Sequence, residues 1–303
     1  MILLPAMLQF AGKYLRMVLK VKKIITVEHK RSGIWQDTDI TYAQVPGWLG
    51  KATMDLKLTI LRPFEEQSHP LPVILWFCGG GWMAVDNNIH LPNLVDFVRA
   101  GFIIASVDYR NSNQAVWPAQ LEDAKAAVRY LKAHADHYQI DVNKIAVMGE
   151  SAGGHLASMT AVTNGLRNFD VGEYLTQTSN IQAAVSWYGV VDPLSAKNNS
   201  KTADFDFVYR NLLGAEPEES PELDAEANPL TFITSKTVPF LILHGTEDKV
   251  VPLADDEKLY QALTDKGVPA DLYEVKGAAH MDEVFMQPQI TDIIIDFLKK
   301  HLK

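Results

Sequence analysis

From residue 71 onward the chain alternates apolar strands with amphipathic helices, and this alternation restricts the fold more than any other feature of the sequence. Runs such as "LPVILWF" and "KIAVMG" are continuous apolar strands of the kind that is buried on both faces. Alternating strands and helices predict a mostly parallel central sheet with helices on both of its faces. The expected helices lie at 93–101, at 117–134, from Ser151 onward, around 254–266 and at 289–302.

Two segments depart from this alternation. Residues 24–62 are predicted to form antiparallel strands at the N-terminal edge, because Met54, Leu56 and Leu58 alternate with polar residues. Residues 192–237 are acidic, rich in proline and without an apolar strand. We interpret them as a small cap-like insertion over the carboxyl edge of the sheet, where open α/β folds bind ligands. The chain is therefore expected to form one domain over 1–303.

The composition limits the classes of partner. Of the 303 residues 47% are apolar and 21% are charged, which is ordinary for a soluble globular protein. The net charge of −9 argues against a nucleic-acid partner, since phosphate binding needs a basic face. A single cysteine, Cys78, excludes an internal disulfide.

Residues 1–22 have apolar side chains at helical spacing and basic side chains largely on the other side. Such an amphipathic helix can lie on a membrane, but more often it packs on its own domain, and we adopt the packing interpretation. Its apolar start is too short to span a bilayer, and its order of charges is the reverse of a secretory signal. We expect no stable membrane insertion and a cytoplasmic location, with the helix as a candidate contact for a homodimer.

The segment "VMGESAGGHLA" contains a candidate nucleophile. Residues 149–153 fit the pattern G-x-S-x-G after a buried strand and at the start of a helix. A serine forced into this sharp turn projects its hydroxyl out of the sheet, and only residues without side chains fit two positions on either side. We therefore predict that Ser151 is the nucleophile.

A serine hydroxyl needs a base, and the base needs an orienting acid. His280 follows the strand "DLYEVK" at the carboxyl edge of the sheet, and Asp248 follows the preceding strand "VPFLILHG". Serine, acid and histidine in this order are typical of α/β-hydrolases. Glu247 and Asp192 are the competing carboxylates. His244 is expected to form hydrogen bonds within its own turn.

The glycines in "LWFCGGGWM" fit this chemistry. Hydrolysis of an ester creates a negative charge on the former carbonyl oxygen, and each preorganised N–H donor can stabilise it by about 3–4 kcal/mol. Gly80 and Gly81 leave the backbone bare for this purpose, and the N–H of Ala152 would complete an oxyanion hole. A phosphate-binding loop would need a following Lys and Ser/Thr, whereas Trp82 and Met83 follow here.

These motifs, together with "VDYRNS" and "GAAH", resemble those of acetyl-esterase/lipase α/β-hydrolases, related to the hormone-sensitive-lipase group and to bacterial xylan and feruloyl esterases. The resemblance runs from about residue 40 to the C-terminus and implies the α/β-hydrolase fold and ester hydrolysis. Relatives carry a histidine before the glycines, where this chain has Cys78. We expect Cys78 to be a small buried residue and the loop to be held more by packing.

The predicted function is a serine carboxylesterase for small-molecule esters of short acyl groups, acetyl above all, without a metal or a cofactor. The aromatic residues named as candidate pocket walls are Trp82, Trp187, Tyr188 and Phe205, for which core packing is an equal alternative. An amidase or formamidase with the same triad and an inactive binding protein on the same fold are the alternatives. A membrane-bound lipase, suggested only by residues 1–22, is weaker.

Overall fold

The computed structural model describes residues 23–47, 50–202 and 206–302. The chain separates into the segment Met1–Ser32 and the compact unit Gly33–Lys303. The amphipathic helix predicted over 1–22 and the candidate wall residue Phe205 lie outside the described residues.

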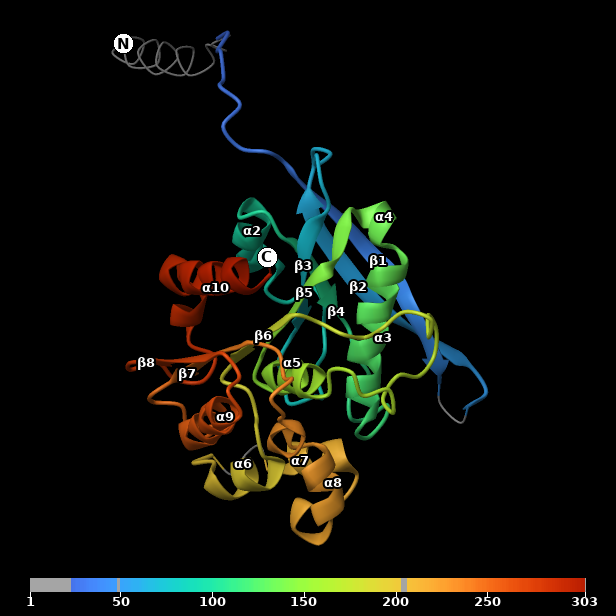
Figure 1. Ribbon diagram of the computed structural model, residues 1–303, viewed down its shortest axis with the longest axis vertical. Coiled ribbons are helices and arrows are strands. Elements are labelled where there is room, and N and C mark those ends of the chain that lie inside the picture. The colour runs from blue at the N-terminus through green and yellow to red at the C-terminus, as the bar shows by residue number, and fades with distance from the viewer. Residues whose placement is uncertain (1–22, 48–49, 203–205, 303) are drawn as a thin grey trace, which may run out of the picture. The chain divides into compact units, whose positions relative to one another are not determined.

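An eight-stranded sheet forms the centre of the compact unit (Figure 1), in the order β1-β2-β4-β3-β5-β6-β7-β8. β1 and β2 are antiparallel to each other, β2 is antiparallel to β4, and all other neighbours are parallel. The predicted antiparallel edge and parallel centre are therefore both present. The strands are β1 (Ile34–Pro46), β2 (Thr53–Pro63), β3 (Leu71–Phe77), β4 (Ile103–Val107), β5 (Ile140–Glu150), β6 (Ala183–Trp187), β7 (Phe240–Gly245) and β8 (Ala270–Val275).

Strand pairing begins later than the sequence predicts. Residues 24–33 form no strand, and Ile24, Ile25 and Val27 are exposed. An extended segment becomes a strand only when its backbone groups find partners, and the first paired residue is Ile34, opposite Pro63 of β2. The prediction of strands from residue 24 is wrong for these ten residues.

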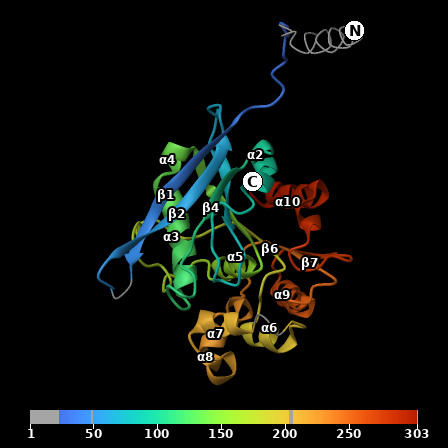
Figure 2. The same cartoon turned by 180° about the vertical axis from the view of Figure 1, so that it is seen from behind.

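Helices cover both faces of the sheet (Figures 1 and 2). Alternate strand residues such as Leu75 and Val147 pack against α3, α5 and α9, whereas their neighbours Ile74 and Met148 pack against α2 and α10. No helix in the described part of the chain is both long enough and apolar enough to cross a bilayer. The helices outside the insertion are α2 (Leu91–Arg99), α3 (Ala119–Ala133), α4 (Ala135–Tyr138), α5 (Ala152–Val162), α9 (Leu253–Asp265) and α10 (Pro288–His301), with the 3₁₀ turn η6 (Glu283–Met286).

The segment 192–237 between β6 and β7 is helical in its described part. Its elements are α6 (Pro193–Asn199), α7 (Phe207–Leu213), α8 (Pro221–Glu226) and the 3₁₀ turns η4 (Pro217–Glu219) and η5 (Pro229–Phe232). In Figure 1 the three α-helices gather below α5 and α9. Backbone hydrogen bonds hold the segment to the body, including Trp117 N–H to the carbonyl oxygen of Leu212 at 2.8 Å and Lys201 N–H to that of Lys249 at 2.8 Å.

His155 of α5 joins the insertion to the helix that follows the candidate nucleophile. The ring is fully buried, lies between Trp82 and Trp117, and its Nε2 donates to the carbonyl oxygen of Ala227 at 2.7 Å. Burial lowers the pKa of His155 from 6.5 to about 4. The ring therefore stays neutral in the folded protein under conditions in which the unfolded chain protonates it.

We predict that this ring makes the protein acid-sensitive. Between pH 7 and pH 5 the unfolded chain binds a proton here and the folded chain does not, so the free energy of unfolding falls by about 2 kcal/mol. In His155→Gln, whose amide can still donate to Ala227, this loss is absent. Urea unfolding of both proteins at the two pH values measures it, and an equal loss in both would contradict a neutral buried ring.

Candidate active site

Ser151 lies in a sharp turn between β5 and α5. Its backbone has φ 51° and ψ −119°, a strained conformation for a residue with a side chain. The turn is possible because β5 and α5 approach closely on either side of it. A Cβ on Gly149 would collide with the carbonyl of Gly153, and a Cβ on Gly153 would collide with the carbonyl of Phe77.

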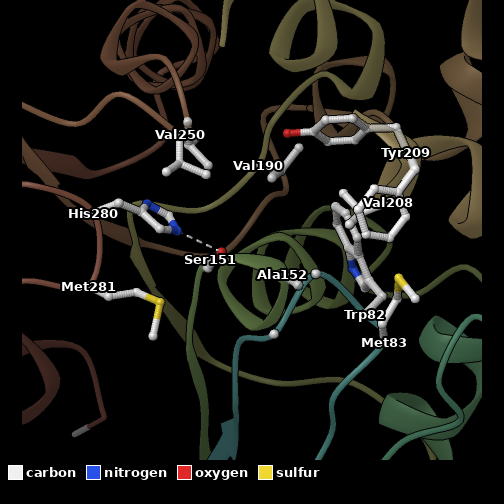
Figure 3. A pocket seen from close by; sticks show the side chains of 14 residues that line it. Trp82, Met83, Ser151, Ala152, Val190, Val208, Tyr209, Val250, His280 and Met281 are labelled. Atoms are coloured by element: carbon white, nitrogen blue, oxygen red, sulfur yellow. Dashed lines mark hydrogen bonds between the residues drawn. The ribbon is translucent and has the colours of Figure 1, made fainter. Parts of the chain in front are cut away.

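The structure brings Ser151, His280 and Asp248 into one hydrogen-bonded chain. His280 Nε2 lies 3.0 Å from Ser151 Oγ, and His280 Nδ1 lies 2.7 Å from Asp248 Oδ2 (Figure 3 shows the first contact). The N–H groups of Val250 and Val251 donate to Asp248 Oδ1 at 2.8 and 2.9 Å. This is the geometry of a nucleophile, its base and the acid that orients the base.

Asp248 is held as a carboxylate. Burial alone would raise its pKa, but hydrogen bonds from His244 and His280 and from the backbone outweigh burial, and the pKa lies well below its usual value. The competing carboxylates have other positions. Glu247 is exposed, and Asp192 caps α6 by accepting from Ser195 N–H at 2.7 Å.

The residues predicted to form the oxyanion hole, Gly80, Gly81 and Ala152, all line the cavity beside Ser151. Ala152 is the first residue of α5, so its N–H has no intrahelical acceptor. Within the described residues no hydrogen bond is recorded for the N–H of Gly80 or Gly81 either. Gly80 has φ 115°, and a Cβ there would collide with the carbonyl of Ala84, so the loop requires glycine at this position.

Polar contacts from Tyr109 and Glu150 brace the glycine loop. Tyr109 OH donates to the carbonyl oxygen of Cys78 at 2.8 Å. The Glu150 carboxylate accepts from Tyr188 OH at 2.6 Å, lies 2.9 Å from His90 Nε2, and is reached by Gly79 N–H at 3.4 Å. Burial would raise the pKa of Glu150, but the hydrogen bonds from His90 and Tyr188 outweigh it and lower the pKa.

Cys78 itself is a small buried residue, as expected. Burial raises the pKa of its thiol to about 12, so it is not a thiolate nucleophile at neutral pH. Its Sγ accepts from Asp86 N–H at 3.4 Å. The prediction that packing mainly holds the loop is incomplete, because Tyr109 bonds the carbonyl of Cys78 and Glu150 links Gly79 to His90. The only sequence signal for this brace was an acidic residue directly before the nucleophile.

A cavity of about 410 Å³ opens beside Ser151. In Figure 3, Trp82, Val208 and Tyr209 stand on one side of the serine, and His280 and Met281 stand on the other. Among the described residues that line it there is no Asp, Glu, Lys or Arg; they are Gly80, Gly81, Trp82, Met83, Ser151, Ala152, Val190, Phe207, Val208, Tyr209, Val250, Val251, His280 and Met281.

Of the three predicted wall residues that the structure describes, Trp82 alone lines this cavity. Trp187 packs instead against Trp76 and Phe285 in the core on the other face of the sheet. Tyr188 is buried beside Phe285, with its hydroxyl on Glu150. Both are taken up by core packing, the alternative that the sequence left open. In the described part of the chain no group of His, Cys, Asp and Glu is arranged to hold a metal ion.

The sequence model of the BD-FAE family matches residues 58–263, which include the glycine loop, Ser151 and Asp248. The chain belongs to the BD-FAE family. Among curated proteins it is 28% identical to esterase LipQ of Mycobacterium tuberculosis over 78% of this chain and 57% of LipQ. It is 30% identical to the probable carboxylic ester hydrolase LipM of the same organism over 63% of this chain and 44% of LipM. The chain thus spans about half the length of these relatives.

Solved structures of esterases have the same fold as this BD-FAE chain. A truncated carbohydrate esterase from gut microbiota has a TM-score of 0.74 at 28% identity, covering 90% of this chain and 98% of that one. Propionate-bound Est2 of Thermogutta terrifontis has a TM-score of 0.70 at 25% identity, covering 87% and 93%. The predicted α/β-hydrolase fold and the resemblance to esterases of this fold are confirmed.

The Glu150 brace generates a prediction for the loop. In Glu150→Ala the link between Gly79 and His90 is lost. We expect kcat for a short-chain ester to fall about 10- to 100-fold, with little change in KM. This fall in kcat is somewhat smaller than the one caused by removing an oxyanion-hole donor. Glu150→Gln can keep an amide oxygen that accepts from Gly79 and present its amide N–H to the hydroxyl oxygen of Tyr188, so it should keep most of the activity. Steady-state kinetics with circular dichroism as a folding control measures this, and full activity in Glu150→Ala would contradict the brace.

Proposed function

We propose that this protein is a serine carboxylesterase that hydrolyses short-chain acyl esters through Ser151, His280 and Asp248. The observation that carries the proposal is the hydrogen-bonded chain from Asp248 through His280 to Ser151, which ends at a cavity lined by Gly80, Gly81 and Ala152. The named esterases among its relatives support the same reaction class.

Each residue has a defined task in this reaction. His280 Nε2 takes the proton of Ser151 Oγ as the oxygen attacks the acyl carbon, and Asp248 stabilises the resulting imidazolium. The N–H groups of Gly80, Gly81 and Ala152 donate to the oxyanion of the tetrahedral intermediate. His280 then returns the proton to the leaving alkoxide. A water molecule, deprotonated by His280, hydrolyses the acyl-serine and releases the carboxylic acid.

The cavity supports a neutral, apolar acyl group. Its walls of Trp82, Val208 and Val250 offer dispersion contacts and no charge to pair with an ionic substrate. The insertion contributes Phe207, Val208 and Tyr209 to these walls, so α7 limits the length of the group that fits beside Ser151. Propionate and butyrate are bound in structures of Est2, which supports short acyl chains here, acetyl to butyryl.

The test is hydrolysis of p-nitrophenyl esters from acetate to decanoate. We expect acetate or butyrate to be preferred, and Ser151→Ala to lose at least about 10³-fold in kcat because no nucleophile remains. Ser158→Ala, which changes a buried serine farther along α5, is the matched control and should retain activity.

Equal rates in Ser151→Ala and the unmodified protein would contradict the assignment of Ser151 as the nucleophile. Hydrolysis of acyl amides but not esters would favour the amidase alternative, and no hydrolysis of either would favour a binding protein.

A further inference from the structure

Asp248 has a second histidine neighbour, His244, and His244 in turn contacts a second carboxylate, that of Asp256. His244, near the end of β7, is fully buried, and its Nδ1 lies 2.6 Å from Asp256 Oδ2 of α9. Its Nε2 lies 3.1 Å from the carbonyl oxygen of Val251 and 3.4 Å from Asp248 Oδ2. The expected hydrogen bond within the turn is therefore present, and the contacts to the two carboxylates go beyond it.

Both ring nitrogens of His244 face oxygen atoms of acceptor groups. A neutral imidazole carries one N–H, so this arrangement needs one further proton, held either by His244 or by Asp256. The imidazole is the stronger base of the two by more than about two pKa units in water. The carboxylate of Asp248 at 3.4 Å adds further stabilisation to a cation on the ring. Burial would lower the pKa of His244, but Asp248 and Asp256 outweigh burial and raise it to about 10.

Apart from Asp248, the other described carboxylates near His244 and Asp256 do not bond to the His244 ring. On α9, Asp255 is buried but accepts from Ser195 Oγ of α6 and from Lys258 Nζ, both at 2.8 Å. On β8, Glu274 is opposite His244 in the register and is exposed. The sequence neighbours of Asp248, Glu247 and Lys249, are exposed. Tyr188 and Tyr209, which lie within range of the charge of Asp248, remain neutral because burial raises their pKa.

We propose that His244 is a positioning residue, a buried imidazolium that Asp256 holds protonated and that shares the carboxylate of Asp248 with His280. The proposal rests on the proposed esterase function for its effect on turnover. A cation on His244 offsets part of the negative charge that His280 experiences from Asp248. The imidazolium form of His280 is then less stabilised, and the neutral form that serves as the base persists to lower pH. His244 thus extends the pH range of activity to lower pH.

The first test is the pH profile of kcat/KM for p-nitrophenyl acetate. In His244→Gln the full charge of Asp248 acts on His280, so the acid limb should move to higher pH, by about one unit. Asp256→Asn removes the group that keeps His244 protonated and should move the limb in the same direction by a smaller amount. Asp255→Asn is the matched control, because Asp255 is adjacent and buried but does not contact His244, and its limb should not move.

The direction of this shift separates the proposal from a purely structural role. Misplacement of Asp248 alone would weaken the stabilisation of the protonated His280, and the acid limb would stay or move to lower pH while kcat falls. Either result in both His244→Gln and Asp256→Asn would overturn the proposal.

A second test needs no substituted protein and no substrate. In the ¹⁵N NMR spectrum of the full chain at about pH 8, where an ordinary imidazole with a pKa of about 6.5 is neutral, both ring nitrogens of His244 should carry protons. A nitrogen without a proton at this pH would overturn the proposal. Because this readout is independent of catalysis, failure of the esterase function and failure of the His244 assignment can be distinguished.

Discussion

The close approach of β5 and α5 at Ser151 is the constraint on which the rest of the site depends. Gly149 and Gly153 allow this approach, and Ser151 takes up the strain with φ 51°, at a cost of about 1–3 kcal/mol. Backbone hydrogen bonds hold the turn, from Ser151 N–H to the carbonyl of Trp187 at 2.9 Å and from His155 N–H to that of Ser151 at 3.0 Å. The turn fixes the point at which His280 and the glycine loop meet the serine hydroxyl.

Much of this arrangement follows from local sequence. Apolar runs predict the parallel strands, and parallel strands place their carboxyl ends at one edge, so residues that follow the strands meet there. Ser151, Asp248 and His280 are all found in this way, because each lies within five residues after the end of a strand. The glycines before Trp82 could be interpreted in the same manner. The insertion could be located between two strands, but its helices carry no periodic signal long enough to predict.

Other parts depend on contacts that no local pattern encodes. Trp187 is the last residue of β6 and Tyr188 follows it. Whether these side chains face a cavity or the core depends on Phe285, nearly a hundred residues later. The brace on the glycine loop joins Glu150 to His90, and the charge behind Asp248 joins His244 to Asp256. In each case both partners are polar residues that single-sequence analysis assigns to turns or surfaces, and only the fold brings them together in the interior.

The attachment of the insertion has a consequence for substrate access. The segment that roofs the cavity is tied to the body through the carbonyls of Leu212 and Ala227 and through the N–H of Lys201. The insertion is thus held at several points, one of them on α5, the helix that follows Ser151. Moving it away from the cavity would break these hydrogen bonds. Each of these hydrogen bonds contributes about 0.5–1.5 kcal/mol, so together they oppose a swinging motion of the described part of the insertion.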